Sequence, residues 1–227
     1  MENRVKAALA AFAMAGVALS ATSSAHAAAK AKPRARPAAP QPVVHLPETA
    51  MQVLNWVVAS GDNGDLPFMV IDKVAAVVAV FDAKGKRLGA SPALFGVTPG
   101  DDSSPGVGDR ELSDIAVEER TTPAGRFVAK FGPAAGGTRV LWVDYATSIS
   151  LHPVITTNKK ERRLQRLTSA TAEDNRITFG CINVPPRFYT RVVVPNFKKD
   201  IGVVYILPEI KSLNEAFPAY QPQMVSR

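Results

Sequence analysis

Short apolar runs separated by turn-forming residues constrain the fold of this 227-residue chain more than any other feature of its sequence. β-branched and apolar residues gather over a few positions at a time, and Gly, Pro, Asp or Asn follow each run, as in strands and hairpins. The pattern predicts a mainly β domain, a sandwich or barrel with a few short peripheral helices. We expect strands at 68–71, 75–81, 87–95, 125–131, 139–144, 148–151, 182–184 and 201–207.

Helical pattern is confined to three short stretches. One helix is expected from Pro47 to about residue 59, because Pro47 and Glu48 are typical of a helix start and Gly61 of a helix end. The other two are expected at 158–167 and 186–193. The stretch 97–110 is rich in Gly, Pro, Asp and Ser, so we expect a long surface loop there.

The first 27 residues have the composition of a secretory signal peptide. Arg4 and Lys6 precede an apolar run, and Ala25-His26-Ala27 has the small-x-small pattern of a cleavage site. The apolar run is short for a membrane span, which needs about 20 apolar residues. We therefore expect an exported protein of the periplasm or cell envelope, with no membrane span after cleavage; an uncleaved anchor is the alternative.

An Ala/Pro-rich basic stretch follows, and we expect an extended linker over 28–46. More than half of the formal net charge of +7 comes from its four basic residues, Lys30, Lys32, Arg34 and Arg36. The remainder, 47–227, is near neutral and has the length of one domain. We therefore expect one folded domain and no nucleic-acid partner.

Cys181 is the only cysteine, so the chain cannot form an internal disulfide. A lone cysteine in an exported protein can be a reactive thiol, a partner in an intermolecular disulfide, or a small buried hydrophobe. Gly180 favours the first reading, because glycine permits a sharp turn and a close approach of substrate. The backbone amides of Gly180 and Cys181 are then candidates to face a developing oxyanion.

A thiol needs a partner that raises its thiolate fraction at neutral pH, and that partner is usually histidine. Of the three histidines, His26 falls in the expected signal peptide and His45 in the expected linker. His152 remains, at the end of the apolar run 148–151. We identify it as the candidate base for Cys181; a core histidine bonded to backbone is the alternative.

Four elements, in this order, resemble the L,D-transpeptidase (YkuD-like) catalytic domain family. They are an apolar run with an Asp-x-x-Gly hairpin at 80–85, Thr-Pro-x-Gly-x-Phe at 122–127, His152 at a strand end, and Thr-x-Gly-Cys-x-Asn at 178–183. The resemblance covers about residues 70–194. It implies the barrel-like fold of that family and a peptidoglycan enzyme that needs no metal and no organic cofactor.

The resemblance also implies a reaction. Cys181 would attack a tetrapeptide stem, release D-Ala and form a thioester, which an amine acceptor would then resolve. The implied partners are peptidoglycan stem peptides, with an envelope protein among the candidate acceptors. By the same resemblance His152 is the base, Thr178 orients it through its backbone carbonyl, and Asn183 is a polar residue near the substrate.

Two positions depart from the family pattern. Most members have histidine where this chain has Phe179, and glycine is common where it has Pro153. The loss of histidine need not abolish catalysis, because the upstream histidine is the family's base. We expect Phe179 to alter the wall of the substrate pocket.

The stretch between His152 and Cys181 is longer than in compact members of the family and contains a basic run at 159–166. Arg163 is a candidate partner for stem-peptide carboxylates, and Arg176 is a weaker one. The alternative for Arg163 is a solvated helix face with Leu164 and Leu167 packed beneath it.

Two other functions stay open on the sequence. Water in place of the amine would make the chain a peptidoglycan amidase or carboxypeptidase with the same Cys-His site. A non-catalytic peptidoglycan-binding protein would keep the fold; Phe179 favours it, whereas retention of Cys181 and His152 opposes it. The acidic residues of 101–114 match no metal-binding loop, so no metal site is expected.

Overall fold

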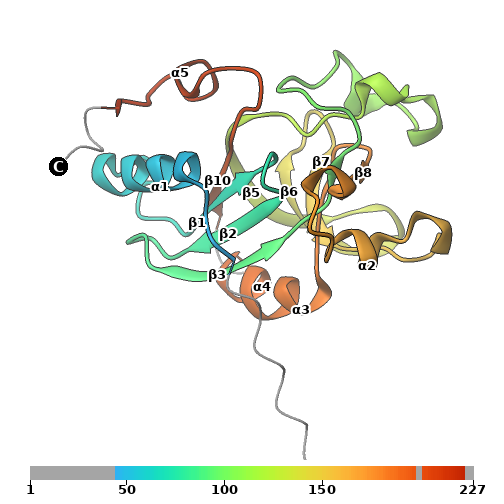
Figure 1. Cartoon of the computed structure of the whole chain (residues 1–227), viewed down its shortest axis with the longest axis horizontal. Coiled ribbons are helices and arrows are strands. Elements are labelled where there is room, and N and C mark those ends of the chain that lie inside the picture. The colour runs from blue at the N-terminus through green and yellow to red at the C-terminus, as the bar shows by residue number, and fades with distance from the viewer. Residues whose placement is uncertain (1–43, 198–200, 223–227) are drawn as a thin grey trace, which may run out of the picture. The chain divides into compact units, whose positions relative to one another are not determined.

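The computed structural model describes residues 44–197 and 201–222 (Figure 1). The expected signal peptide, 1–27, and nearly all of the expected linker, 28–46, lie outside these residues. The described part is mainly β, with short helices around the strands, which confirms the fold class predicted from the sequence.

Eight strands form one sheet in the order β3-β2-β1-β10-β5-β6-β7-β9. β1 pairs with β10 and β7 with β9 in parallel, and the other neighbours are antiparallel. Two further strands, β4 and β8, pair with each other in parallel. The bounds are β1 Phe68–Asp72, β2 Val77–Phe81, β3 Arg87–Pro92, β4 Phe95–Gly96, β5 Gly125–Pro133, β6 Arg139–Asp144, β7 Ile149–Pro153, β8 Arg176–Thr178, β9 Ile182–Val184 and β10 Gly202–Ile206.

The sheet curls until its edge strands β3 and β9 nearly meet. Leu94, just beyond β3, forms an isolated antiparallel bridge with Asn183 of β9. The backbone N–H of each residue donates to the carbonyl of the other, at 2.8 and 2.9 Å. The result is a nearly closed, barrel-like sheet in which β9 is held on both sides.

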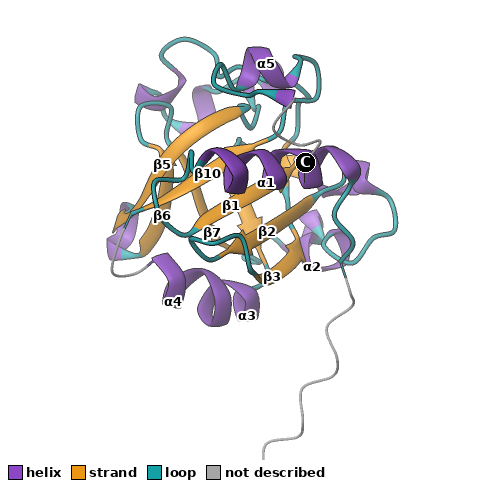
Figure 2. Cartoon of the chain, turned by 90° about the vertical axis from the view of Figure 1, so that its left-hand side faces the viewer, coloured by secondary structure: helices purple, strands orange, loops and turns teal. Residues whose placement is uncertain are grey.

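The central strands β1, β2 and β10 are buried on both faces. In β1, Met69 and Ile71 join the core enclosed by the sheet, whereas Phe68 and Val70 join a second cluster beneath α1 (Glu48–Ser60). Figure 2 shows α1 lying across this outer face. Because both faces are covered, these strands are continuous apolar runs.

The predicted helix at 158–167 is confirmed only in part, because it is broken into two short pieces. The structure has a 3-10 helix, Lys159–Glu161, and a four-residue helix, α2 (Arg163–Arg166). They are separated because Arg162 has a left-handed φ of +51°, which interrupts the helix. The predicted strand 87–95 is also too long, because the chain leaves β2 after Pro92 and crosses to β9.

The other helices are short. The helix predicted at 186–193 begins as α3 (Pro186–Phe188) and continues through a π-helical turn, Tyr189–Val193, into α4 (Val194–Phe197). α5 (Leu213–Ala216) was not predicted. Among the helices of residues 44–197 and 201–222, none is both long and apolar enough to cross a membrane.

Candidate active site

Cys181 lies in a tight turn between β8 and β9 and is partly exposed. Gly180 precedes it with a φ of +125°, a conformation that L side chains rarely adopt. A Cβ at Gly180 would lie 2.8 Å from the carbonyl oxygen of Thr121 and 2.7 Å from Cδ1 of Ile149. Both the backbone conformation and the lack of space therefore require glycine before the cysteine.

Parallel pairing of β7 with β9 brings the cysteine and histidine segments together. The register places His152 opposite Asn183. Two residues earlier along the same chain segments, Oγ of Ser150 lies 3.5 Å from Sγ of Cys181. The carbonyl oxygen of Ser148 lies 3.6 Å from the same sulfur. The thiol therefore sits at the edge of β7, beside the strand that carries the only histidine of the expected domain.

The two ring nitrogens of His152 have different partners. Nδ1 lies 2.8 Å from the carbonyl oxygen of Pro153, and Nε2 lies 3.1 Å from the amide nitrogen of Asn183. A carbonyl oxygen only accepts, so Nδ1 carries a proton and donates it. An amide nitrogen only donates, so Nε2 is the acceptor. These contacts fit a neutral imidazole.

Cys181 and His152 shift each other's pKa toward an ion pair. Burial raises the pKa of the Cys181 thiol, but the neighbouring His152 and Ser150 outweigh burial, and the pKa is lowered. Burial lowers the pKa of His152, but its interaction with Cys181 outweighs burial, and the pKa is raised. The Pro153 carbonyl adds to this rise, and the charge of Arg163 opposes it. Such a pair can supply a thiolate nucleophile near neutral pH.

The backbone carbonyl of Thr178 does not orient His152, contrary to expectation. It accepts the N–H of Val97 at 3.0 Å instead. The carbonyl that meets the imidazole belongs to Pro153, the residue next to the histidine along the chain. Because Pro153 and His152 are adjacent in β7, the contact between them does not require β8.

The hydroxyl of Thr178 instead spans the turn that contains Cys181. It donates to the carbonyl of Cys181 at 2.7 Å and accepts the N–H of Gly180 at 3.1 Å. The amide of Gly180 is therefore engaged and is not free to meet an oxyanion, contrary to expectation. For the N–H of Cys181 the structure gives no acceptor among the residues that it describes.

Arg163 and Asn183 bond to each other. Nη1 of Arg163 donates to Oδ1 of Asn183 at 2.8 Å, and its Nε donates to the carboxylate of Glu161 at 2.5 Å. Asn183 is only 1% exposed. Arg163, expected to bind substrate carboxylates, is thus paired with a carboxylate of the chain itself, and Asn183 lies between it and His152.

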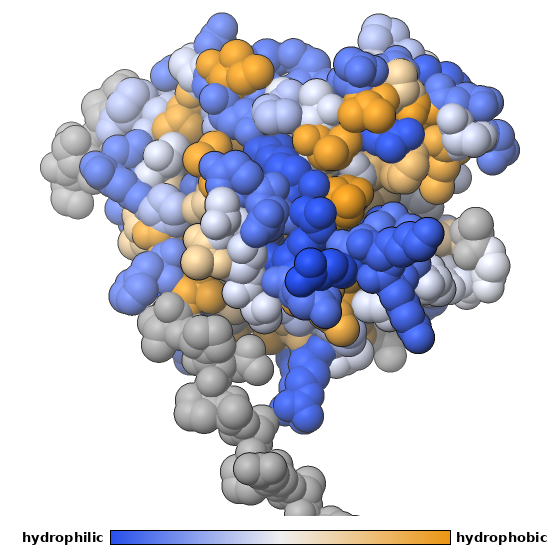
Figure 3. All heavy atoms as spheres, turned by 45° about the vertical axis from the view of Figure 1, so that its right-hand side comes forward, coloured by the Kyte–Doolittle hydropathy of each residue, from blue (hydrophilic) through white to orange (hydrophobic). Residues whose placement is uncertain are grey.

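The segment from Val154 to Asn175 connects β7 with β8 and carries α2. Leu167 and Val154 are buried against Leu94, whereas Leu164 is 52% exposed. The face of the molecule on which α2 lies is mostly hydrophilic (Figure 3). The alternative interpretation was a solvated helix face with Leu164 and Leu167 packed beneath it. The packing is confirmed for Leu167 and wrong for Leu164.

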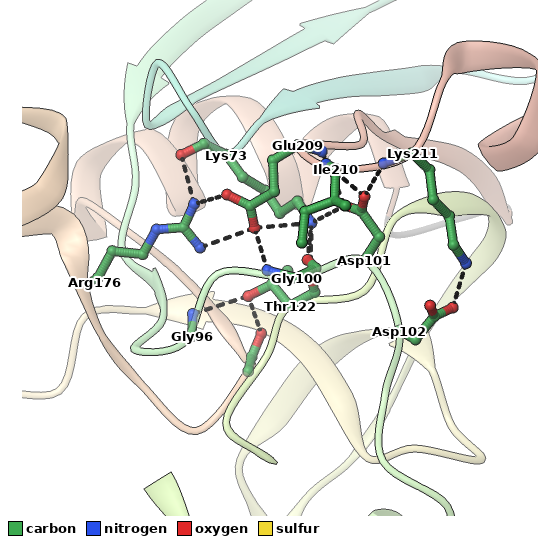
Figure 4. A network of polar contacts seen from close by, with 11 residues as sticks. Lys73, Gly96, Gly100, Asp101, Asp102, Thr122, Arg176, Glu209, Ile210 and Lys211 are labelled. Atoms are coloured by element: carbon green, nitrogen blue, oxygen red, sulfur yellow. Dashed lines mark hydrogen bonds and ion pairs between the residues drawn. The ribbon is translucent and has the colours of Figure 1, made fainter. Parts of the chain in front are cut away.

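Arg176 belongs to a buried ionic cluster, which we define as Lys73, Asp101, Arg176 and Glu209 (Figure 4). The side chains of Lys73 and Asp101 are 0% and 1% exposed, and their charged atoms are 2.8 Å apart. The guanidinium of Arg176 is paired with Glu209. Arg176, a weaker candidate for substrate carboxylates, thus has its charge neutralised inside the cluster.

Thr122 connects the ionic cluster with the Cys181 turn. Its carbonyl accepts from Nζ of Lys73 at 2.9 Å, and its hydroxyl donates to the carbonyl of Gly180 at 2.7 Å. The same hydroxyl accepts the N–H of Gly96 at 2.9 Å. Because the peptide group is planar, holding the carbonyl of Gly180 also fixes the direction of the N–H of Cys181.

Phe179 packs against the long loop that follows β4. The guanidinium of Arg120 lies 4.0 Å from the centre of its ring. That guanidinium also donates twice to the carbonyl of Ile115, at 3.1 and 2.9 Å. The loop predicted at 97–110 thus extends to residue 124, with three 3-10 turns in it. A cation over an aromatic face is attractive, so Phe179 helps to hold this loop beside the turn.

The sequence interpretation missed Ser150, the carbonyl of Pro153 and the role of Thr122. Ser150 could have been found, because it lies two residues before His152 in a strand and therefore on the same face. Thr122 was noticed only as part of a family motif. Its bond to Gly180 joins residues 58 positions apart, and no local pattern predicts it.

Solved structures with a similar fold are L,D-transpeptidases or a cell-shape protein. The catalytic domain of an L,D-transpeptidase from E. faecium is 16% identical, covers 63% of this chain and 98% of that chain, and has a TM-score of 0.39. The L,D-transpeptidase of Xylanimonas cellulosilytica is 13% identical, with 63% and 61% covered and a TM-score of 0.37. The helical cell shape determining protein of Campylobacter jejuni is 12% identical, with 73% and 58% covered and a TM-score of 0.44.

The chain thus spans about three fifths of the length of the last two proteins. No family model matches the chain, and no curated protein matches it either. At these identities and TM-scores no residue role is transferred from one protein to another. The roles of Cys181 and His152 therefore rest on the geometry and on the sequence elements.

Proposed function

We propose that this chain is an exported cysteine acyltransferase of the L,D-transpeptidase type, acting on peptidoglycan stem peptides. The observation that carries the proposal is the surroundings of Cys181. The thiol follows an obligatory glycine, lies 3.5 Å from Oγ of Ser150, and has its pKa lowered despite burial by the neighbouring His152 and Ser150. The substrate class rests on the four sequence elements that resemble the family.

The first half of the reaction forms a thioester. Nε2 of His152 accepts the proton of the Cys181 thiol, and the thiolate attacks the carbonyl carbon of meso-diaminopimelate in a tetrapeptide stem. The oxygen becomes an oxyanion and accepts a hydrogen bond from the N–H of Cys181. The C–N bond to D-Ala breaks, and the departing amine takes the proton from His152.

The second half returns the enzyme to its starting state. An amine acceptor attacks the thioester carbonyl, His152 accepts the proton that the amine loses, and the thiolate leaves. Cys181 then recovers its proton from His152. The product is a 3–3 cross-link, a stem with an exchanged D-amino acid, or a link to an envelope protein, depending on the amine.

The other residues around the turn have supporting roles in this proposal. Thr178 holds the turn closed through its hydroxyl, and Thr122 directs the N–H of Cys181. Ser150 donates to the thiolate. Phe179 forms part of the pocket wall where most family members have histidine. The steps use only these side chains and backbone groups.

Mass spectrometry of reaction products tests the proposal. Purified protein is incubated with tetrapeptide muropeptides and a free D-amino acid. We expect a 3–3 dimer or an exchanged stem, and a thioester adduct on Cys181. Cys181→Ala should abolish all three products. His152→Gln should slow adduct formation at least about 100-fold, which is the usual contribution of a general base.

His45→Gln is the matched control, because it removes an exposed histidine of the chain far from β7 in sequence. It should leave every rate unchanged. A tripeptide as the only product would replace transpeptidation by hydrolysis. Absence of both turnover and adduct would overturn the proposal and leave a peptidoglycan-binding protein.

Export is part of the proposal and has its own test. The intact gene is expressed in a diderm bacterium, and the mature protein is sequenced from its N-terminus after fractionation. We expect the periplasmic fraction to hold a chain that begins near Ala28. A full-length chain in the membrane fraction would favour the uncleaved anchor instead.

A further inference from the structure

The hydrogen bonds around His152 continue to α2. Asn183 contacts Nε2 of His152 through its amide nitrogen at 3.1 Å and Arg163 through its amide oxygen at 2.8 Å. Asn183 is 1% exposed, and the side chain of Arg163 is 13% exposed. Water therefore has little access to replace either contact. Glu161 holds the guanidinium from its other side.

The chemistry of these groups fixes the direction of each hydrogen bond. A guanidinium has five N–H donors and no acceptor, so it can face only the oxygen of the Asn183 amide. With the oxygen directed to Arg163, the NH2 group must face His152. Without Arg163, the amide could turn over and present its oxygen to the ring.

The orientation of the amide decides which form of His152 is favoured. An NH2 group beside Nε2 suits the neutral imidazole, whose Nε2 accepts. The imidazolium carries a proton on Nε2 and would face another donor. The positive charge of Arg163 acts in the same direction. The neighbouring thiol acts in the opposite direction, so the two influences compete at one ring.

We propose that Arg163 is a positioning residue that acts through Asn183 to favour the neutral form of His152. While Arg163 is docked on Asn183, transfer of the thiol proton to His152 is less favourable than it would be without that contact. Release of Arg163 lets the amide turn over and accept from Nε2–H, which stabilises the thiolate–imidazolium pair. The base of the site is thereby linked to the position of residues 154–175.

The charged and titratable side chains that the structure places around the ring are Cys181 and Arg163, with Glu161 paired to Arg163. The test therefore starts from Cys181→Ala, which removes the thiolate and its coupling. In that background the pKa of His152 is measured by NMR of histidine-labelled full-length protein. The measurement needs no substrate, so it can succeed or fail independently of the proposed peptidoglycan activity.

Arg163→Met should raise the pKa of His152 by about one unit, a tenfold change in the equilibrium, because it removes a nearby charge and frees the amide. Arg163→Lys should retain most of the parent value, since ammonium also only donates. Arg166→Met is the matched control. Arg166 lies on the same short helix and bonds the carbonyls of Glu161 and Asp174, but it does not contact Asn183.

A double-mutant cycle separates positioning from charge alone. In an Asn183→Ala background, Arg163→Met should shift the pKa of His152 clearly less than it does with Asn183 present. Equal shifts in the two backgrounds would overturn the inference and leave only a Coulomb effect. Equal shifts in the pKa of His152 from Arg163→Met and Arg166→Met would also overturn the inference. Both substitutions would then act by disturbing the fold of residues 154–175 and not through Asn183.

Discussion

The buried ionic cluster is connected to the Cys181 turn through Thr122, and the Arg163–Glu161 pair is connected to His152 through Asn183, but the two lie in different electrostatic settings. In the cluster, Lys73 and Asp101 are almost fully buried, and each has several fixed partners. In the pair, the side chain of Glu161 is 29% exposed, on a 3-10 turn beside a four-residue helix.

The difference in burial determines whether each set of charges can change its contacts. A buried charge that loses its partner is left without water, so the cluster cannot rearrange without a large loss of stability. The Arg163–Glu161 pair can separate at a lower cost than the cluster, because water reaches the carboxylate of Glu161, which is 29% exposed. The cluster therefore suits a fixed backbone beneath Gly180, and the pair suits an adjustable contact beside His152.

Lys73→Met should break the cluster and have the largest effect on stability. The carboxylate of Asp101 would be buried without its counter-ion, and the carbonyls of Gly100 and Thr122 would lose a donor. We expect the free energy of unfolding to fall by about 3–5 kcal/mol. Urea titration measures it, with the exposed Lys86→Met as control. A loss below about 1 kcal/mol would show that the cluster does not stabilise the fold.

Strong acid should weaken the cluster through Asp101. Burial raises the pKa of Asp101, but the hydrogen bond from Lys73 and the backbone N–H groups of residues 209–211 outweigh burial and lower it from 3.8 to about 2. Because the folded pKa lies below the unfolded one, this contribution is present above about pH 4 and is lost as the pH falls through about 2.

Protonation of Asp101 between pH 5 and pH 2 should lower the free energy of unfolding by about 2 kcal/mol, because the pKa of its carboxyl is nearly two units lower in the folded state than in the unfolded state. Urea titrations at pH 5 and pH 2 measure it in the parent protein and in Asp101→Asn. The variant should lose less stability than the parent over this interval. Identical losses would mean that Asp101 has no lowered pKa in the folded state.

Thr122→Val should show how much the Cys181 turn depends on the cluster. The substitution removes the hydroxyl that bonds to Gly180 but leaves the four charged residues of the cluster unchanged. The N–H of Gly96 and the carbonyl of Gly180 would lose their buried partner. We expect a loss of about 1–2 kcal/mol and slower alkylation of Cys181 by iodoacetamide. Thr122→Ser keeps the hydroxyl and should restore both. Failure of serine to restore alkylation would assign the effect to packing instead.

Glu161→Gln should have the smallest effect on stability. Its ion pair with Arg163 is partly exposed, so we expect a change of about 0.5 kcal/mol or less in the free energy of unfolding. Glu119→Gln is a suitable comparison, since Glu119 pairs with Arg110 at similar exposure. If Glu161→Gln alone lowers the free energy of unfolding by more than about 2 kcal/mol, the Arg163–Glu161 pair stabilises the fold as the cluster does. The two sets of charges would then not differ in role.

The sequence predicted the sheet better than it predicted the segments around the site. Continuous apolar runs such as 77–81 gave correct strands, because burial on both faces leaves a strong local signal. The basic stretch 159–166 was predicted as one helix and is two short pieces, because helical composition cannot reveal the left-handed Arg162. β8 was missed, since three residues with one buried position have no recognisable period.

The sequence by itself determined the mainly β fold class and indicated the two candidate reactive groups. Cys181 is the only thiol, and His152 is the only histidine in the expected domain, so a count of residues was sufficient. Only the tertiary structure decided which groups surround them. The register of β7 on β9 and the closure of the sheet at Leu94 place Ser150 at the sulfur and Asn183 between His152 and Arg163. That register depends on packing of the whole barrel, which no short stretch of sequence encodes.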